Sequence, residues 1–166
     1  YKRRDIRRAK NVEVWDRFYY VGQVREEQYS FDAQSVRPYF PYTQVAKGIF
    51  DLYGELFNVR FKKLEDAPVW HPSVEAYGMY DVEGDSLIGQ FYLDMHPRDG
   101  KYKHAAMFPL RTGLANGRMP MGALVCNFPD PSEGDGSALM EHSQVQTYFH
   151  EFGHLIHQLL AQRGTW

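Results

Sequence analysis

The stretch Thr147–Gln158, TYFHEFGHLIHQ, constrains the fold of this 166-residue chain most strongly, because it has the pattern of one amphipathic helix. Apolar residues recur at alternating spacings of four and three along it, which makes one stripe on a helix: Val145, Phe149, Phe152, Ile156 and Leu159. A rotation of about 100° per residue puts His150, His154 and His157 within a narrow arc on the opposite side. The sequence therefore predicts a helix with an apolar face for a core and a separate histidine face.

Residues 150–154 read H-E-F-G-H, which matches the zinc-binding pattern H-E-x-x-H. Residues four apart lie one turn above each other, with about 5–6 Å between Cβ atoms, so both imidazoles can reach one zinc ion. Glu151 lies off the line that joins the histidines and can act as a general base on water. The pattern predicts His150 and His154 as metal ligands and Glu151 as the catalytic residue. The alternative is a surface helix whose histidines are solvated.

The predicted metal site lacks a ligand within this chain. A catalytic zinc takes three protein ligands and keeps one open position. The 12 residues that follow His154 contain no Asp or Glu. His157 could bind in principle, but three ligands on one straight helix would crowd a single face, so we interpret His157 as a residue on the substrate side. The site is therefore expected to be incomplete here.

The order of the predicted elements favours an α+β fold, mainly helical, with a small antiparallel sheet between N-terminal helices and the C-terminal histidine helix. Helical spacing marks residues 1–24 and Thr43–Phe57, and Ser143 with Gln146 fits a capping box at the start of the final helix. Strands are expected at Asn58–Leu64, twice within Val74–Pro97, at His104–Leu110 and at Met121–Phe128. No clear linker interrupts the chain, so we expect a single domain over residues 1–166.

Composition and charge argue against several classes of function. A net charge of −2 and a pI near 6.4 give no electrostatic basis for binding nucleic acid or an anionic membrane, and no apolar run approaches the length of a membrane span. Cys126 is the only cysteine, which excludes an intrachain disulfide and favours a reducing, cytoplasmic location. Because the chain begins with Tyr1 and not with Met, we expect it to be a piece of something larger.

Several long segments occur in the order in which one family carries them: VWDRFYY, GQFYLDMHPRDGKYKHAAMFPL and MGALVCNFPDPSEGDGSALMEHSQVQTYFHEFGH. From about Val14 to Gln162 the chain resembles the thimet oligopeptidase and oligopeptidase A family of zinc metallopeptidases, which are gluzincin-like. The resemblance implies one Zn²⁺ per complete site, held by His150 and His154, with Glu151 as the general base. It also implies hydrolysis of internal bonds in short peptides.

The same resemblance implies what this chain lacks. The third ligand of the family is a glutamate on the next helix, and no position here matches it. The chain is therefore expected to be an internal part of a larger zincin catalytic domain, to need the remainder of that domain, and to be inactive or nearly so in isolation.

An edge strand near the zinc aligns the peptide substrate in members of this family. We expect that edge around His104, Ala105, Ala106 and Met107, where two small residues would let a peptide backbone approach. An ordinary internal strand with a surface histidine is equally compatible with the sequence.

A rival function belongs to a different class. The chain could be a catalytically inactive, truncated module that binds peptide or metal and has lost its chemistry. The sequence leaves open the cleavage preference, endopeptidase against dipeptidyl carboxypeptidase action, and the oligomeric state.

Overall fold

The computed structural model describes four stretches of the chain: residues 11–29, 33–114, 117–134 and 137–161. The sequence predicts one domain, whereas the contacts in the structure group into two units, residues 1–36 and 37–166, and each is described by itself. The first unit contains the 3-10 helix η1 (Val14–Asp16) and the helix α2 (Arg17–Tyr29), neither of which buries a residue. A further 3-10 helix, η2, spans Ala33–Tyr39.

The second unit is built on a five-stranded sheet with the strand order β1-β2-β3-β5-β4. Its strands are β1 (Val59–Lys63), β2 (Glu75–Asp81), β3 (Leu87–Asp94), β4 (Ala106–Arg111) and β5 (Met121–Val125). The prediction of an antiparallel sheet is wrong at one place, because β3 and β5 run parallel. The chain leaves β3, forms β4 and returns as β5 between them, and this insertion leaves no mark in the local sequence.

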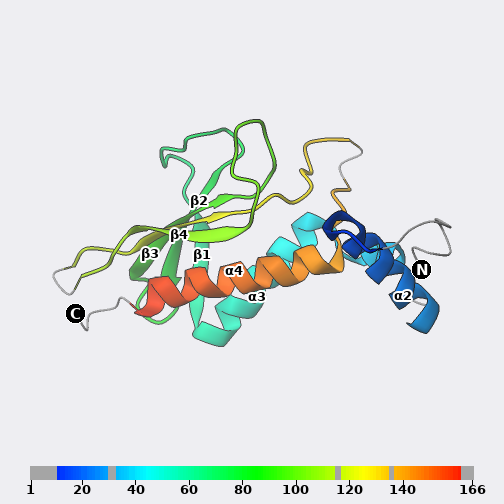
Figure 1. Cartoon of the computed structure of the whole chain (residues 1–166). Coiled ribbons are helices and arrows are strands. Elements are labelled where there is room, and N and C mark those ends of the chain that lie inside the picture. Colours follow the sequence, from blue (N-terminus) through cyan, green and yellow to red (C-terminus); the bar gives the residue numbers. More distant parts are fainter. Residues whose placement is uncertain (1–10, 30–32, 115–116, 135–136, 162–166) are drawn as a thin grey trace. The chain divides into compact units, whose positions relative to one another are not determined.

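Two long helices, α3 (Tyr42–Phe57) and α4 (His142–Ala161), lie on the same side of this sheet (Figure 1). Their apolar residues and one face of the strands form the core. Phe152 is fully buried at its centre, with ring centroids 5.0 to 6.2 Å away on Phe50, Tyr53, Phe61, Phe91 and Tyr148. Edge-to-face and tilted aromatic pairs of this kind add to the stabilisation that burial alone gives. Aromatic residues make up 16% of the sequence, and several of them hold α4 against the rest of the core.

The buried face of α4 is close to the predicted stripe but rotated. The residues that it buries are Tyr148, Phe152, Leu155, Ile156, Gln158 and Leu159. Val145 and Phe149, which the sequence assigns to the stripe, are only half-buried. The cause is that α4 packs against α3 and against three strands, β3, β4 and β5, so its contact surface is wider than a single row of side chains.

The predicted start of α4 is wrong by two residues. The helix begins at His142, and the backbone N–H of Glu141 donates to Oε1 of Gln144 at 2.8 Å. This capping pair has the same spacing as the predicted Ser143–Gln146 pair. The preceding backbone selects the earlier pair, because the N–H of Met140 donates to the carbonyl of Phe40 at 2.9 Å and fixes where the chain enters the helix.

None of the helices in the described part of the chain has the length and apolar character that a membrane span requires.

Close approach of α4 to the sheet requires glycine in the strands beneath it. A Cβ on Gly122 of β5 would lie 2.5 Å from Oε1 of Gln158 and 2.7 Å from Cδ1 of Leu155. A Cβ on Gly89 of β3 would lie 2.9 Å from Cδ2 of Leu159. These distances are shorter than carbon and oxygen atoms tolerate, so the helix can rest at this height only because neither position has a side chain.

We expect Gly122→Ala to lower the free energy of unfolding by about 1–3 kcal/mol, because overpacking forces buried side chains of α4 out of place. The matched control is Gly48→Ala in α3, where an added Cβ meets nothing within 4 Å. That change should raise stability by roughly 0.5–1 kcal/mol, since alanine loses less backbone entropy in a helix. Urea unfolding measures both. Equal effects of the two substitutions would contradict the packing described here.

Candidate active site

The two histidines of the H-E-x-x-H pattern point their outer ring nitrogens at each other on the exposed side of α4. The Nε2 atoms of His150 and His154 lie 3.1 Å apart, and their ring centroids are 4.6 Å apart with the planes nearly perpendicular. Two imidazoles bound to a tetrahedral zinc at about 2.0–2.1 Å have their nitrogens ~3.3 Å apart. The pair therefore fits a shared metal ion, and the same distance also suits a hydrogen bond between the rings.

The described residues do not complete a metal site around this pair. Residues 11–29, 33–114, 117–134 and 137–161 contain no group of three His, Cys, Asp or Glu side chains that could hold a metal ion. His157 is exposed on the same helix and has no hydrogen-bond or ring partner within that part of the chain. The structure thus brings together two histidine nitrogens at a separation that suits a shared metal ion.

Glu151 lies at the border between the buried and the exposed face of α4 and is half-buried. Its Oε2 accepts a hydrogen bond from the backbone N–H of Met107 in β4, with an N–O distance of 3.2 Å. The sequence does not predict this contact, because the two residues are 44 positions apart and belong to different elements. The hydrogen bond places the carboxylate beside the outermost strand of the sheet.

The predicted substrate edge begins later than expected. β4 starts at Ala106, which pairs with Val125 of β5, and β4 is the last strand in the sheet order. His104 and Ala105 precede the strand. The exposed ring of His104 lies 5.4 Å from that of Tyr102, and its carbonyl accepts from Nδ2 of Asn127 at 3.3 Å. The structure therefore puts Ala106 in a strand that ends the sheet and leaves His104 in the loop before it.

That loop is anchored by a buried lysine that sequence analysis did not single out. The Nζ of Lys101 donates to the carbonyls of Asp94, His96 and Cys126 at 2.9, 2.6 and 2.6 Å. It also forms an ion pair of 2.9 Å with Oδ1 of Asp94, and both side chains are almost wholly buried. Three carbonyls and a carboxylate satisfy the ammonium group, which fixes the ends of β3 and β5 and the loop that leads into β4.

Asp94 is the centre of this anchor. Arg98 donates to both of its carboxylate oxygens at 2.6 and 2.8 Å, and Nε1 of Trp70 donates to Oδ2 at 2.9 Å. Burial acts to raise the pKa of Asp94, but the hydrogen bonds from Arg98, Lys101 and Trp70 outweigh it and hold that pKa well below the usual range. The carboxylate therefore stays ionised at neutral pH. A signal for it existed in the sequence, since Asp94 and Arg98 are four residues apart.

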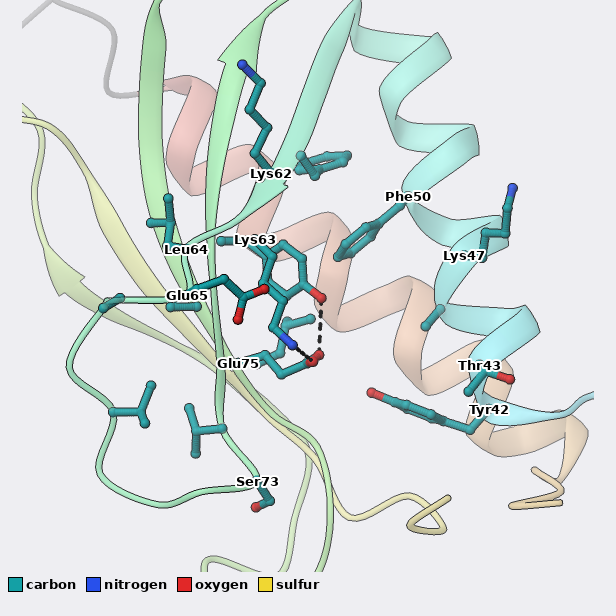
Figure 2. Close-up of a pocket in the computed structure, with 18 of the residues that line it drawn as sticks. Tyr42, Thr43, Lys47, Phe50, Lys62, Lys63, Leu64, Glu65, Ser73 and Glu75 are labelled. Carbon is teal, nitrogen blue, oxygen red and sulfur yellow. Dashed lines mark hydrogen bonds and ion pairs between the residues drawn. The ribbon is translucent and has the colours of Figure 1, made fainter. Parts of the chain in front are cut away.

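A separate cavity of about 1300 Å³ opens between α3 and the β1–β2 side of the sheet, and Figure 2 shows its lining. None of His150, Glu151 or His154 lines it. Within it, Oε1 of Glu75 accepts from Nζ of Lys63 at 2.7 Å and Oε2 accepts from the hydroxyl of Tyr77 at 3.1 Å. The carboxylate of Glu75 is thus already paired, and the candidate active site lies elsewhere, on the exposed side of α4.

The comparisons with known proteins agree with the resemblance seen in the sequence. The sequence model described as Peptidase family M3 matches residues 1–165. The chain therefore belongs to peptidase family M3.

Named relatives are oligopeptidases of greater length. Thimet-like oligopeptidase of Dictyostelium discoideum is 40% identical over 150 residues, which cover 87% of this chain and 22% of that protein. Saccharolysin of Saccharomyces cerevisiae is 36% identical over 162 residues, covering 92% and 23%. Oligopeptidase A of Salmonella typhimurium is 34% identical over 161 residues, covering 95% and 23%. The chain thus spans less than a quarter of the length of these curated relatives.

We expect Lys101→Met to lower the free energy of unfolding by about 3–5 kcal/mol at neutral pH, because it leaves a buried carboxylate without one of its partners. The stabilisation from a carboxylate with a lowered pKa is present above the unfolded value near 4 and is lost as the pH falls further. The difference between variant and wild type should therefore be constant above about pH 5 and narrow below about pH 4. Urea unfolding across pH 3–7 tests this, and a difference that grows in acid would contradict it.

Proposed function

We propose that this chain carries the metal-binding and general-base part of a zinc metallopeptidase site that hydrolyses internal peptide bonds of short peptides. The observation that carries the proposal is the 3.1 Å separation of the His150 and His154 Nε2 atoms on the exposed face of α4. Membership of peptidase family M3 and the names of the relatives support the reaction class. Glu151, next to the first histidine on the same helix, supplies a carboxylate for proton transfer.

His150 and His154 would hold the metal through their Nε2 atoms, which requires both rings to be neutral. Zinc, when bound, acts as a Lewis acid and makes water nucleophilic near neutral pH. Glu151 would take the proton from the attacking water and deliver it to the leaving amine. General acid–base transfer of this kind contributes about 10²–10⁴-fold to rate. The neighbouring residues His104, Ala105, Ala106 and His157 are proposed to contact the peptide.

The third zinc ligand is proposed to come from the remainder of a larger catalytic domain, since the chain spans under a quarter of its named relatives. Two histidines alone should bind zinc more weakly than a complete site of three protein ligands. The isolated chain should therefore hydrolyse peptides slowly or not at all. We also propose a cytoplasmic location, which rests on the single cysteine.

Zinc titration of the isolated chain, with the heat of binding measured by calorimetry, tests the metal assignment. We expect one weak site per chain. His150→Ala and His154→Ala should each weaken it by at least about tenfold, the lower bound of the cost measured for losing an outer-shell partner. The matched control is His157→Ala, which removes an exposed histidine three residues away and should leave the affinity unchanged. Glu151→Gln should also leave it unchanged, because Glu151 is proposed as a base and not as a ligand.

A fluorogenic peptide incubated with the chain and added zinc gives the second measurement. A zinc affinity that is unchanged in both His150→Ala and His154→Ala would overturn the proposed site. Robust peptide hydrolysis by the isolated chain would contradict the proposal that the third zinc ligand comes from outside it. If the complete protein binds zinc but hydrolyses no peptide, the rival function, a non-catalytic binding module, is correct.

A further inference from the structure

The backbone of β4 has one hydrogen-bonding edge that no strand of the described chain occupies. Alternate residues of an antiparallel strand direct their N–H and C=O groups to opposite edges. The N–H of Met107 donates to the side chain of Glu151, which places the amide of residue 107 on the outer edge of β4. Pro109, two residues on, must face the same edge, and proline is confined to such edges because it has no N–H. The sequence of β4 and its contact with α4 thus agree on which edge is free.

The outer edge of β4 meets Glu151 in one defined contact. The N–H of Met107 donates to Oε2, and this is the carboxylate's only hydrogen bond within the described part of the chain. The side chain of Met107 packs against the core, which holds its backbone in place. Oε1 of Glu151 is therefore left without a hydrogen-bond partner among the described residues, while Oε2 is held.

A glutamate on a helix has three rotatable side-chain bonds, and a base must hold its oxygen within reach of the proton it takes. Packing of α4 fixes the backbone of Glu151 but does not choose between rotamers at the border of the buried face. A hydrogen bond from a rigid strand to one carboxylate oxygen supplies that choice. Hydrogen bonds to an ionised acceptor are also stronger than those between neutral groups.

We propose that the Met107 backbone N–H is a positioning group for Glu151, which anchors Oε2 so that Oε1 is presented to the reacting water. The importance of this anchor rests on the proposed function, in which Glu151 is the base. The anchor also reserves one amide of the β4 edge, so a bound peptide would use the other outward-facing groups of this segment and not this N–H.

The hydrogen bond itself can be tested on the metal-free chain by amide hydrogen exchange of ¹⁵N-labelled protein. Glu151→Ala should raise the exchange rate of the Met107 amide by about tenfold or more, as the loss of a hydrogen bond to a charged group predicts. Glu151→Gln keeps an oxygen acceptor and should restore most of the protection. The control is Glu55→Ala, which removes an exposed glutamate of α3 and should change nothing at Met107. An unchanged Met107 amide in Glu151→Ala would overturn the proposal.

The positioning role is tested by Met107→Pro against Met107→Ala. Both lose the methionine side chain, but only proline removes the N–H, and the extended backbone of Ala106 accepts a following proline. Amide protection of Phe108 should persist in both variants, which shows that β4 is still formed. In the peptide-hydrolysing protein that contains this segment, Met107→Pro should lower kcat by about ten- to hundredfold relative to Met107→Ala, with KM little changed.

The two measurements separate failure of this inference from failure of the proposed function. Equal kcat for Met107→Pro and Met107→Ala, with Glu151→Gln inactive, would overturn the positioning role and leave Glu151 as the base. Full activity of Glu151→Gln would contradict the proposed function itself, in which Glu151 is the general base. Loss of Phe108 protection only in Met107→Pro would show that the N–H serves the strand and would also overturn the proposal.

Discussion

Helix α4 rests directly on β5 and β3 because Gly122 and Gly89 leave room for the side chains of Leu155, Gln158 and Leu159. Phe152, at the centre of the H-E-x-x-H pattern, is locked at the same time into the aromatic core. The rotation and height of the helix are therefore set by apolar contacts, and no polar interaction of the histidines is needed to set them. Residues on the far side of α4 must then face outward.

The division of chemistry on α4 follows from this packing. His150 and His154 are exposed because they lie opposite the buried face, and their spacing of four residues lets their side chains bring the two Nε2 atoms to 3.1 Å. Glu151 lies at the border of the two faces, where the outermost strand passes. The two histidines that we propose as metal ligands thus face solvent, while the carboxylate of Glu151 contacts the backbone of β4. The Lys101–Asp94 anchor supports this arrangement, since it fixes the loop that leads into that strand.

Features that depend on local periodicity could be predicted from the sequence. The helix itself, the separation of its histidines from its apolar residues, and the β2–β3 hairpin all arise from neighbours within a few positions. The insertion of β5 between β3 and β4 could not be predicted, because strand order depends on contacts across the whole sheet. The Met107–Glu151 hydrogen bond could not be predicted either, because it joins residues 44 positions apart in two different elements. The start of α4 was misplaced because two capping pairs share one spacing, and only the tertiary contacts of Met140 select between them.

The histidine pair and Glu151 are held by contacts within residues 37–161, although the described residues contain no group of three side chains that could hold a metal ion. Preorganisation of ligands lowers the entropic cost of binding a metal, because the ligands lose less freedom when the metal binds. In the proposed site, a third ligand from elsewhere would add to two nitrogens whose separation is already close to that around a tetrahedral zinc ion. Tightness of metal binding would then depend on the third ligand, whereas the direction from which Glu151 would act as a base depends on the helix and on the strand beside it. Under the proposed function, metal affinity and the geometry of the base would therefore depend on different parts of the structure.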